Sequence, residues 1–453
     1  MPISEGLRTS LNQIRETSIE NGTLYHRQID EITPTTDISA LSMKLFDNDD
    51  LMNEFLNVLV KRIIYTQLVN FKLFNNPLKF LEGDKMPLGS IGQEIFINPA
   101  KGRKFDCNDF AGLLAKYESD VKVQYMHLNS DIQYPVTITR AKLKDAFVSW
   151  GELERFVDGI TQSLYNGAYI DRYNFTKGLV ASAYNENAVK VDVINAINSE
   201  ALAKAFLVKA RTYFLNMQEP SADYNAWRQV GGYGKDVLTW TDKEDIVFLI
   251  RNDVASYLDV NVLSQAFNID KADLLGRVKY VKDFSEYDNE GNVVVDGSNI
   301  VAMIADKAWF RIKNQETTMD EFYNANNRTW QMYLNDVNMF QYSLFCNAVV
   351  FATEAPQVTI TGLEVSNDEV TVSVGGTAKV TVTTTPAQAN YPDITVTSSD
   401  SDIATATISG KTITITGVSA DDTNEQDGEA TITVTAGNIT DTITVTVPYV
   451  AGE

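Results

Sequence analysis

The stretch from Phe147 to Asn185 contains no proline and constrains the fold more than any other part of the chain. Its apolar residues recur at steps of three, four or seven, which places them on one side of a helix. These residues are Leu153, Phe156, Val157, Ile160, Leu164, Ala168, Phe175 and Leu179. At about 1.5 Å per residue, a continuous helix of this length is a rod about 50 Å long. Such a rod is typical of a scaffold axis; the alternative is a long helix of an ordinary bundle.

The sequence marks where this helix begins. Ser149 and Glu152 have the spacing of a capping box, and Val148 and Leu153 have that of a hydrophobic staple. Three glycines then weaken the helix, each by up to about 1 kcal/mol relative to alanine. We expect packing to compensate there, or a neighbouring element to approach closely. The glycines are Gly159, Gly167 and Gly178.

The segments before the helix differ in character. Residues 1–70 are polar at first and then helical, as an N-terminal arm that packs on something else would be. Residues 72–135 are interrupted every few residues by proline or glycine, with short extended pieces such as 94–97. A long excursion of this kind is usually functional, and one that lies on a neighbouring subunit explains it. The alternative is a surface β-hairpin within one subunit.

The segments after the helix mix strands and helices. Residues 188–315 alternate between apolar strand patterns, as at 246–250 and 300–304, and amphipathic helical patterns, as at 258–267. This interleaving indicates an α/β or α+β subdomain. We interpret residues 316–352 as long strands that return to the helix, although periodicity alone leaves a helix possible there.

The composition changes abruptly after residue 354. All five tryptophans and all phenylalanines precede this point, and threonine alternates with valine and isoleucine beyond it. Short strands of period two over roughly 90 residues indicate an antiparallel sandwich of immunoglobulin size. The acidic segment 421–427 is expected to be a solvated loop, with a calcium site as the alternative.

Composition excludes several functional classes. With only two histidines and two distant cysteines, Cys107 and Cys346, a disulfide framework or a cysteine-based metal site is excluded and a histidine-rich one is not expected. No nucleophile elbow, P-loop, dinucleotide fingerprint or zinc-protease motif is present, so we expect no enzyme, no catalytic residues and no cofactor. The net charge of −22 does not suit a groove that grips nucleic acid. Neither a membrane span nor a secretory signal is expected.

Six ordered segments resemble one family, the major capsid (head) protein of phi-29-like podoviruses. They are 74–80, 86–89, 146–151, 258–268, 306–310 and 345–351. Farther along, 374–378, 384–387, 398–400 and 403–405 resemble the bacterial immunoglobulin-like group 2 repeat, which these capsid proteins carry at this end.

The resemblance implies an α+β fold of the Hong-Kong-97-like capsid type, with a long spine helix, an extended β-hairpin loop and a C-terminal all-β immunoglobulin-like sandwich. The segments implied are an N-terminal arm (1–70), an extended loop (71–137), a spine helix of the peripheral domain (138–187), an axial domain (188–315), peripheral-domain strands (316–353) and the immunoglobulin-like domain (357–449).

The function implied is that of a major capsid protein of a tailed double-stranded DNA bacteriophage. Copies would self-assemble in the host cytoplasm into pentamers and hexamers of the icosahedral head of the virion. The implied partners are other copies of the chain, a scaffolding protein, the portal or connector, and packaged double-stranded DNA held non-specifically on the inner face. The immunoglobulin-like domain is a candidate for contact with the host cell surface.

We expect the loop to contact a neighbouring subunit through apolar side chains in a stretch too rich in turns to form its own core. These residues are Pro77, Leu78, Phe80, Pro87, Leu88 and Ile95. Two other classes compete with a capsid protein. A bacterial surface or adhesive protein would need the secretory signal that the sequence lacks, and a phage tail protein would lack the long helix and extended loop.

Overall fold

The computed structural model describes residues 3, 5–48, 50–52, 54–55, 73–87, 92–103, 115–227, 237–257, 277–288, 290–420 and 426–449. The chain divides into two compact units. Unit 1 comprises Met1–Glu94, Tyr125–Thr176 and Phe310–Gln341; unit 2 comprises Ile95–Gln124, Lys177–Trp309 and Tyr342–Glu453. The predicted loop and spine segments, 71–137 and 138–187, therefore contribute residues to both units.

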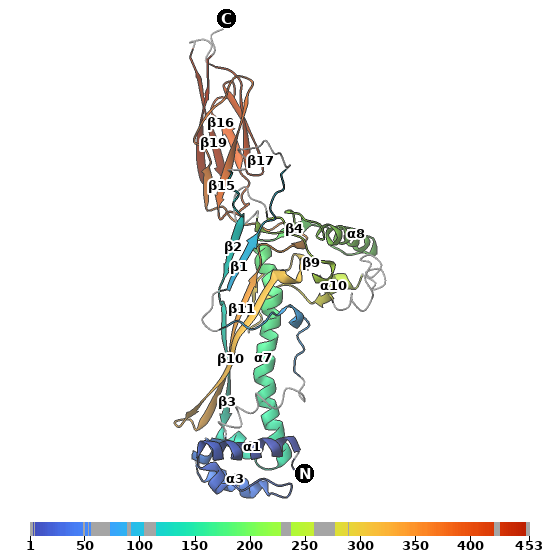
Figure 1. The fold of residues 1–453 in the computed structure, drawn as a ribbon, viewed down its shortest axis with the longest axis vertical. Helices are drawn as coiled ribbons and strands as arrows, with labels where there is room; N and C mark the ends of the chain where they lie inside the picture. The colour runs from blue at the N-terminus through green and yellow to red at the C-terminus, as the bar shows by residue number, and fades with distance from the viewer. Residues whose placement is uncertain are drawn as a thin grey trace. The chain divides into compact units, whose positions relative to one another are not determined.

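The predicted long helix is confirmed as α7, which runs without interruption from Trp150 to Asn185 over 36 residues (Figure 1). The Glu152 backbone N–H donates to Ser149 Oγ at 3.3 Å, as a capping residue requires. The predicted hydrophobic staple is wrong, because Leu153 is buried whereas Val148 is 71% exposed.

Two of the three helix glycines lie where another element approaches closely, as expected. A Cβ atom at Gly167 would lie 3.0 Å from a ring carbon of Tyr134, and one at Gly178 would lie 2.9 Å from Cβ of Glu286. A Cβ atom at Gly159 would have no neighbour within 4 Å. Close approach therefore explains Gly167 and Gly178 but not Gly159.

Unit 1 is built around a three-stranded sheet in the order β10-β11-β3. The strands are β10 (Phe310–Asn324), β11 (Thr329–Tyr342) and β3 (Ser130–Thr139), which confirms long strands in the predicted region. Strand β3 pairs antiparallel with β11, and Pro135 is tolerated because β3 is an edge strand.

Short helices complete the core of unit 1. They are α1 (Glu5–Asn21), α2 (Tyr25–Gln28), α3 (Ile38–Phe46) and α6 (Arg140–Ala146). Leu11, Leu45 and Phe55 from the N-terminal arm share one buried cluster with Phe147 and Leu153. The arm therefore packs on its own subunit, next to the start of α7 (Figure 1).

Unit 2 contains a five-stranded sheet in the order β4-β12-β9-β5-β6. Its strands are β4 (Lys190–Val193), β12 (Ala348–Ala352), β9 (Ile300–Asp306), β5 (Ile246–Arg251) and β6 (Val278–Val281). Helix α8 (Glu200–Asn216) packs on it through Phe206, whose ring lies 6.0 Å from Phe248 and 5.0 Å from Phe351. The predicted helix at 258–267 lies outside the described residues.

The remaining short elements belong to the turns and loops. They are η1 (Lys79–Leu81), β1 (Gly92–Ile97), β2 (Val121–Met126), η2 (Lys243–Asp245), α10 (Asn252–Ala255), β7 (Glu286–Tyr287), β8 (Val293–Val295) and η3 (Lys307–Trp309). None of the helices in the described ranges is both long and apolar enough to cross a membrane.

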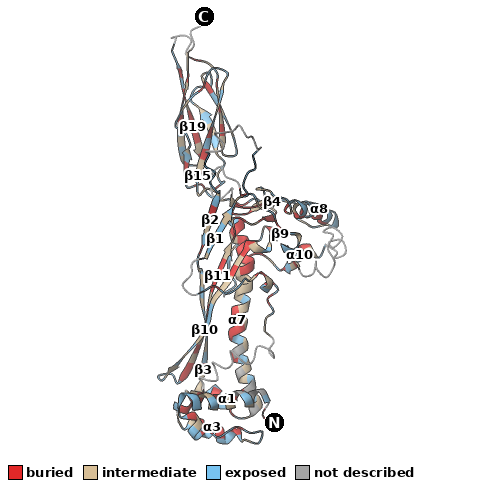
Figure 2. Cartoon of the chain, in the orientation of Figure 1, coloured by how far each residue is buried: buried red, intermediate tan, exposed pale blue. Residues whose placement is uncertain are grey.

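The C-terminal region is a sandwich of two four-stranded sheets, in the orders β13-β15-β18-β17 and β14-β20-β19-β16. Alternate residues of β18 and β19, such as Ile413 and Ile432, fill its core, and Figure 2 shows buried and less buried residues alternating along the strands. The prediction of a wholly antiparallel sandwich is wrong in one pair, because β14 runs parallel to β20. The strands are β13 (Gly362–Val365), β14 (Glu369–Thr371), β15 (Thr377–Thr385), β16 (Thr395–Ser398), β17 (Ala404–Ser409), β18 (Thr412–Gly417), β19 (Gly428–Ala436) and β20 (Ile439–Val447).

Candidate assembly surface

The first part of the predicted loop follows the edge of β10 in unit 1. The Gly83 N–H donates to the carbonyl of Ile312 at 2.8 Å, and the Met86 N–H donates to that of Asn314 at 2.9 Å. Leu78, Leu81 and Met86 are all buried here. These side chains hold residues 78–86 against their own subunit, because burial of each removes a large apolar surface from water.

A buried charged network lies beside this segment and joins it to α7. Arg172 Nε donates to Asp336 Oδ2 at 2.8 Å, and an Arg172 amino group donates to the other oxygen of the same carboxylate. Glu82 lies 4.0 Å from Arg172. Burial raises the pKa of Glu82, and Arg172 only partly opposes this. Burial alone would also raise the pKa of Asp336, but the hydrogen bonds and charge of Arg172 hold it below its usual range.

Strands β1 and β2 pair as a two-stranded ribbon, and one face of this ribbon is used by the chain itself. In unit 2 the Phe96 ring stacks on that of Phe345 at 5.5 Å, and Gln124 Nε2 donates to the carbonyl of Tyr342 at 2.8 Å. In unit 1, Met126 belongs to a small buried cluster with Met86 and Met339.

The other face of the ribbon is apolar and exposed. Along β1, Ile95 is 56% and Ile97 is 60% exposed, in alternation with the partly buried Glu94 and Phe96. Along β2, Val121 is 47% and Tyr125 is 69% exposed. We call Ile95, Ile97 and Val121, which all belong to unit 2, the outer ribbon face. Exposed apolar side chains gathered on one short element mark a contact with another molecule more often than single ones do.

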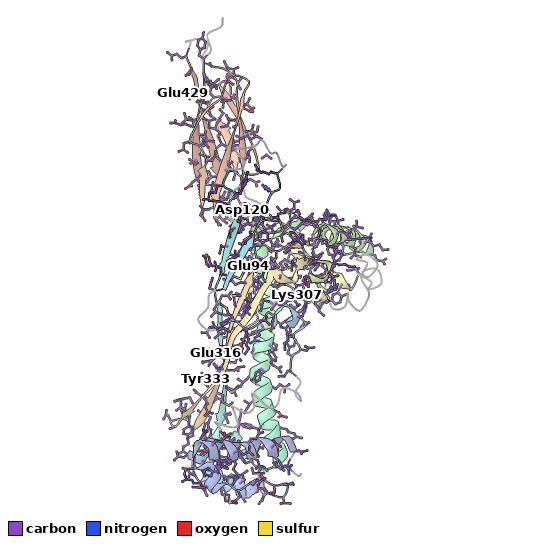
Figure 3. All side chains as sticks on the ribbon, viewed as in Figure 1. Glu94, Asp120, Lys307, Glu316, Tyr333 and Glu429 are labelled. Carbon is purple, nitrogen blue, oxygen red and sulfur yellow. The ribbon has the colours of Figure 1, made fainter. Side chains whose placement is uncertain are left out.

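A polar network fixes the end of the ribbon in unit 2. The Asn98 N–H donates to the carbonyl of Asp120 at 3.0 Å, and Asn98 Nδ2 donates to the Asp120 carboxylate at 2.8 Å. Asn98 Oδ1 accepts from the Leu238 N–H at 2.9 Å, and Lys122 Nζ donates to the other Asp120 oxygen at 2.6 Å. Asp120 and Glu94 are both labelled on the ribbon in Figure 3. The network gives the outgoing chain beyond Asn98 a fixed starting direction.

The six residues predicted to contact a neighbouring subunit differ in how far they are exposed. Pro77, Pro87 and Ile95 are exposed, and Phe80 is partly buried. Leu78 is fully buried within its own subunit, so its side chain is not available to a neighbour, and this corrects the expectation for that residue. Leu88 lies outside the described residues. The inter-subunit role of the others stays a prediction.

Sequence reasoning missed two members of the outer ribbon face, Ile97 and Val121. A signal for them was present, because residues 121–126 read Val-Lys-Val-Gln-Tyr-Met, with apolar and polar residues in alternation. Among the residues that the structure describes, no three His, Cys, Asp or Glu side chains gather as a metal ion would require.

Comparison with known families gives two matches. Residues 11–352 match the family described as Phi29-like phage major capsid protein. Residues 359–447 match the bacterial Ig-like domain of group 2. Together the two matches cover nearly all of the chain.

Individual proteins agree with these matches. The chain is 29% identical over 355 residues to the major capsid protein of Bacillus phage B103, covering 77% of this chain and 74% of that protein. It is 26% identical over 317 residues to the major capsid protein of Streptococcus phage Cp-1, covering 65% of this chain and 81% of that protein. Among solved structures, the capsid structure of Staphylococcus phage Andhra matches with a TM-score of 0.52 at 15% identity, over 64% of this chain and 87% of that one. This last likeness concerns the fold alone.

Proposed function

This chain belongs to the Phi29-like phage major capsid protein family, and on that premise we propose how its copies build a shell. It is a major capsid protein of a bacteriophage with a Hong-Kong-97-like fold, and it ends in a group 2 immunoglobulin-like domain. The proposal is that the copies form pentamers and hexamers, which tile an icosahedral head around double-stranded DNA. Heterologous contacts that close into rings generate such units.

The outer ribbon face carries this proposal. One face of the ribbon packs on its own subunit through Phe96 and Gln124. We propose that the opposite face, which is apolar and exposed, contacts a second copy of the chain. Fully burying a side chain such as Ile95 or Ile97 contributes about 1.5–3 kcal/mol. A modest contact of this size suffices in a shell, because each copy is held by several neighbours at once and the effective concentration is high.

The test is the double variant Ile95→Asp with Ile97→Asp. Both side chains are exposed, so we expect a folded subunit that no longer forms shells under negative-stain electron microscopy and sedimentation. The matched control is Val374→Asp in the immunoglobulin-like domain, where the valine is 56% exposed. Shells of normal number and shape from the double variant would refute the role of the ribbon.

The other partners follow from family membership as proposals. They are a scaffolding protein that guides assembly in the host cytoplasm, a portal or connector at one vertex, and packaged DNA at the inner face. The net charge of −22 supports weak, non-specific contact with DNA, because an acidic surface lets DNA move past without adhering. The role proposed is structural rather than catalytic.

We propose that the immunoglobulin-like domain is an accessory on the shell, either for adherence to the host cell surface or for local stability. Its separate hydrophobic core, which includes Ile413 and Ile432, supports this role. The match over 11–352 favours a capsid protein over a bacterial surface protein that shares only this last domain.

A further inference from the structure

The three-stranded sheet of unit 1 has one face toward α7 and one away from it. On the first face, Tyr134 OH donates to Asp171 at 2.9 Å, and Asp336 pairs with Arg172. On the second, a row of side chains crosses all three strands. Gln133 Nε2 donates to Asn335 Oδ1 at 2.8 Å, and Asn335 Nδ2 donates to Asp320 Oδ2 at 2.6 Å. We call this second face the outer sheet face.

The outer sheet face is acidic. Asp320 and Asp131 are exposed on it, and Glu316 is an exposed residue of the same stretch of β10, labelled with Tyr333 in Figure 3. Residues 316–324 of β10 contain no lysine or arginine. Phe322 adds an apolar side chain that is 58% exposed. The surface thus offers carboxylates beside an exposed aromatic ring, which suits a partner with cations and apolar groups.

Strand β10 lies at the edge of this sheet in the described part of the chain. The segment 83–86 pairs with β10 at Ile312 and Asn314, and Gln315 Nε2 donates to the carbonyl of Pro87 at 3.2 Å.

The same chain carries the complementary charge at the end of its ribbon. Lys101 and Arg103 are exposed, and Arg103 also lies over the Tyr117 ring at 5.6 Å. On the returning side, Glu118 is paired with Lys116, and Asp120 is paired with Lys122. We call Lys101 and Arg103 the ribbon tip, and their positive charge contrasts with the chain's net charge of −22.

We propose that Lys101 and Arg103 of one copy dock on the outer sheet face of the next copy, at Glu316 and Asp320. This inference rests on the proposed function, since it names the surface that receives the loop. Two complementary surfaces at different places on one chain make a heterologous, head-to-tail contact, which is the kind that closes into rings. The charges would set partner orientation and register, and the outer ribbon face would add apolar area.

Charge reversal tests the pairing in the full chain, co-expressed with the scaffolding protein of the same phage. The sheet variant is Glu316→Lys with Asp320→Lys, and the tip variant is Lys101→Glu with Arg103→Glu. We expect each to lower the shell yield by at least about tenfold, because like charges then face each other. The variant with all four reversals should recover most of the yield. Glu429→Lys and Lys379→Glu, exposed in the immunoglobulin-like domain, are matched controls and should assemble normally.

A cross-linking experiment tests directly whether Arg103 of one copy lies next to Glu316 of another. In a background with Cys107→Ser and Cys346→Ser, one copy carries Arg103→Cys and another carries Glu316→Cys. Oxidised shells made from the mixture should give a disulfide-linked dimer, and shells made from either copy alone should not. Normal assembly of both reversed variants, or no dimer from the mixture, would overturn the inference. If Ile95→Asp with Ile97→Asp still abolishes shells in that case, the proposed function survives; if the unaltered chain forms no shells, the proposed function itself fails.

Discussion

Arg172 of α7 and Asp336 of β11 form a two-point ion pair in the interior of unit 1, although 164 positions separate them in the sequence. Asp336 is only 1% exposed and also accepts from Thr317 Oγ1 at 2.8 Å and Asn338 Nδ2 at 2.7 Å. This pair joins the long helix to the sheet. Its charges are tolerated because hydrogen bonds satisfy the carboxylate from several sides.

Replacing Arg172 by methionine should leave a buried carboxylate without its cation. We expect the free energy of unfolding to fall by about 3–5 kcal/mol. Urea unfolding followed by tryptophan fluorescence measures this, because all five tryptophans precede the immunoglobulin-like domain. The control is Arg155→Met, which removes an exposed pair with Glu152 and should change stability by less than about 1 kcal/mol. Equal effects of the two variants would contradict this account.

The glycines of α7 should respond to alanine in opposite directions. Gly159→Ala should stabilise the subunit by up to about 1 kcal/mol, because alanine favours a helix and nothing lies within 4 Å of the new methyl group. Gly178→Ala should destabilise it, because the methyl group would lie 2.6 Å from Glu286 Oε2 and 2.9 Å from Glu286 Cβ. The thermal unfolding midpoints of both variants test this prediction. A higher midpoint for Gly178→Ala would contradict the close approach of Glu286 to Gly178.

The pKa of Glu82 gives a signed pH dependence. Burial raises this pKa in the folded chain above its ordinary value of 4.5, so the folded state binds more protons than the unfolded state between the two values. The contribution of Glu82 to stability is therefore fully present below pH 4.5 and is lost as pH rises through the folded pKa. Glu82→Gln, which removes this titration, should become more stable relative to the natural chain as pH rises through that window. Parallel stability curves for the two chains would show that Glu82 titrates normally.

Leu78 should matter for folding rather than for docking. Leu78→Ala should lower the free energy of unfolding by about 2–5 kcal/mol, because it leaves a cavity in a fully buried site. The neighbouring exposed residue gives the control, Pro77→Ala, which should change stability by much less. Chemical denaturation of the unassembled subunit measures folding stability separately from docking. An unchanged denaturation midpoint for Leu78→Ala would mean that Leu78 does not stabilise the fold and would again favour a contact with a neighbouring subunit.

Deleting residues 357–453 should leave a chain that still folds and still forms shells. The reason is that the C-terminal sandwich has its own core and strand order, with β14, β16, β19 and β20 in one sheet. Electron microscopy of particles from the truncated chain is the measurement. Complete failure to form shells would mean that this domain is needed for assembly.

Local patterns predicted the elements whose side chains are repeated at a regular interval. The steps of three and four from Leu153 to Leu179 predicted α7, and the two-residue alternation after residue 357 predicted most strands of the sandwich. The fold family and the function were predicted from the resemblance to capsid proteins, not from these local patterns. Residues 78–97 were harder to interpret, because prolines and glycines there obscure whether an apolar side chain points inward or outward. Leu78 and Ile95 have the same chemistry in the sequence, yet one is fully buried and the other is mostly exposed.

The sequence by itself determined a long helix, a strand-rich C-terminal domain and membership in a capsid family, because each of these depends on residues that are near one another in the chain or on an ordered set of motifs. The tertiary structure alone decided that Arg172 meets Asp336, that β14 runs parallel to β20, and that the ribbon keeps an apolar outer face. The physical reason is that burial and pairing depend on which distant segment arrives beside a residue, and no local pattern of side chains specifies that segment.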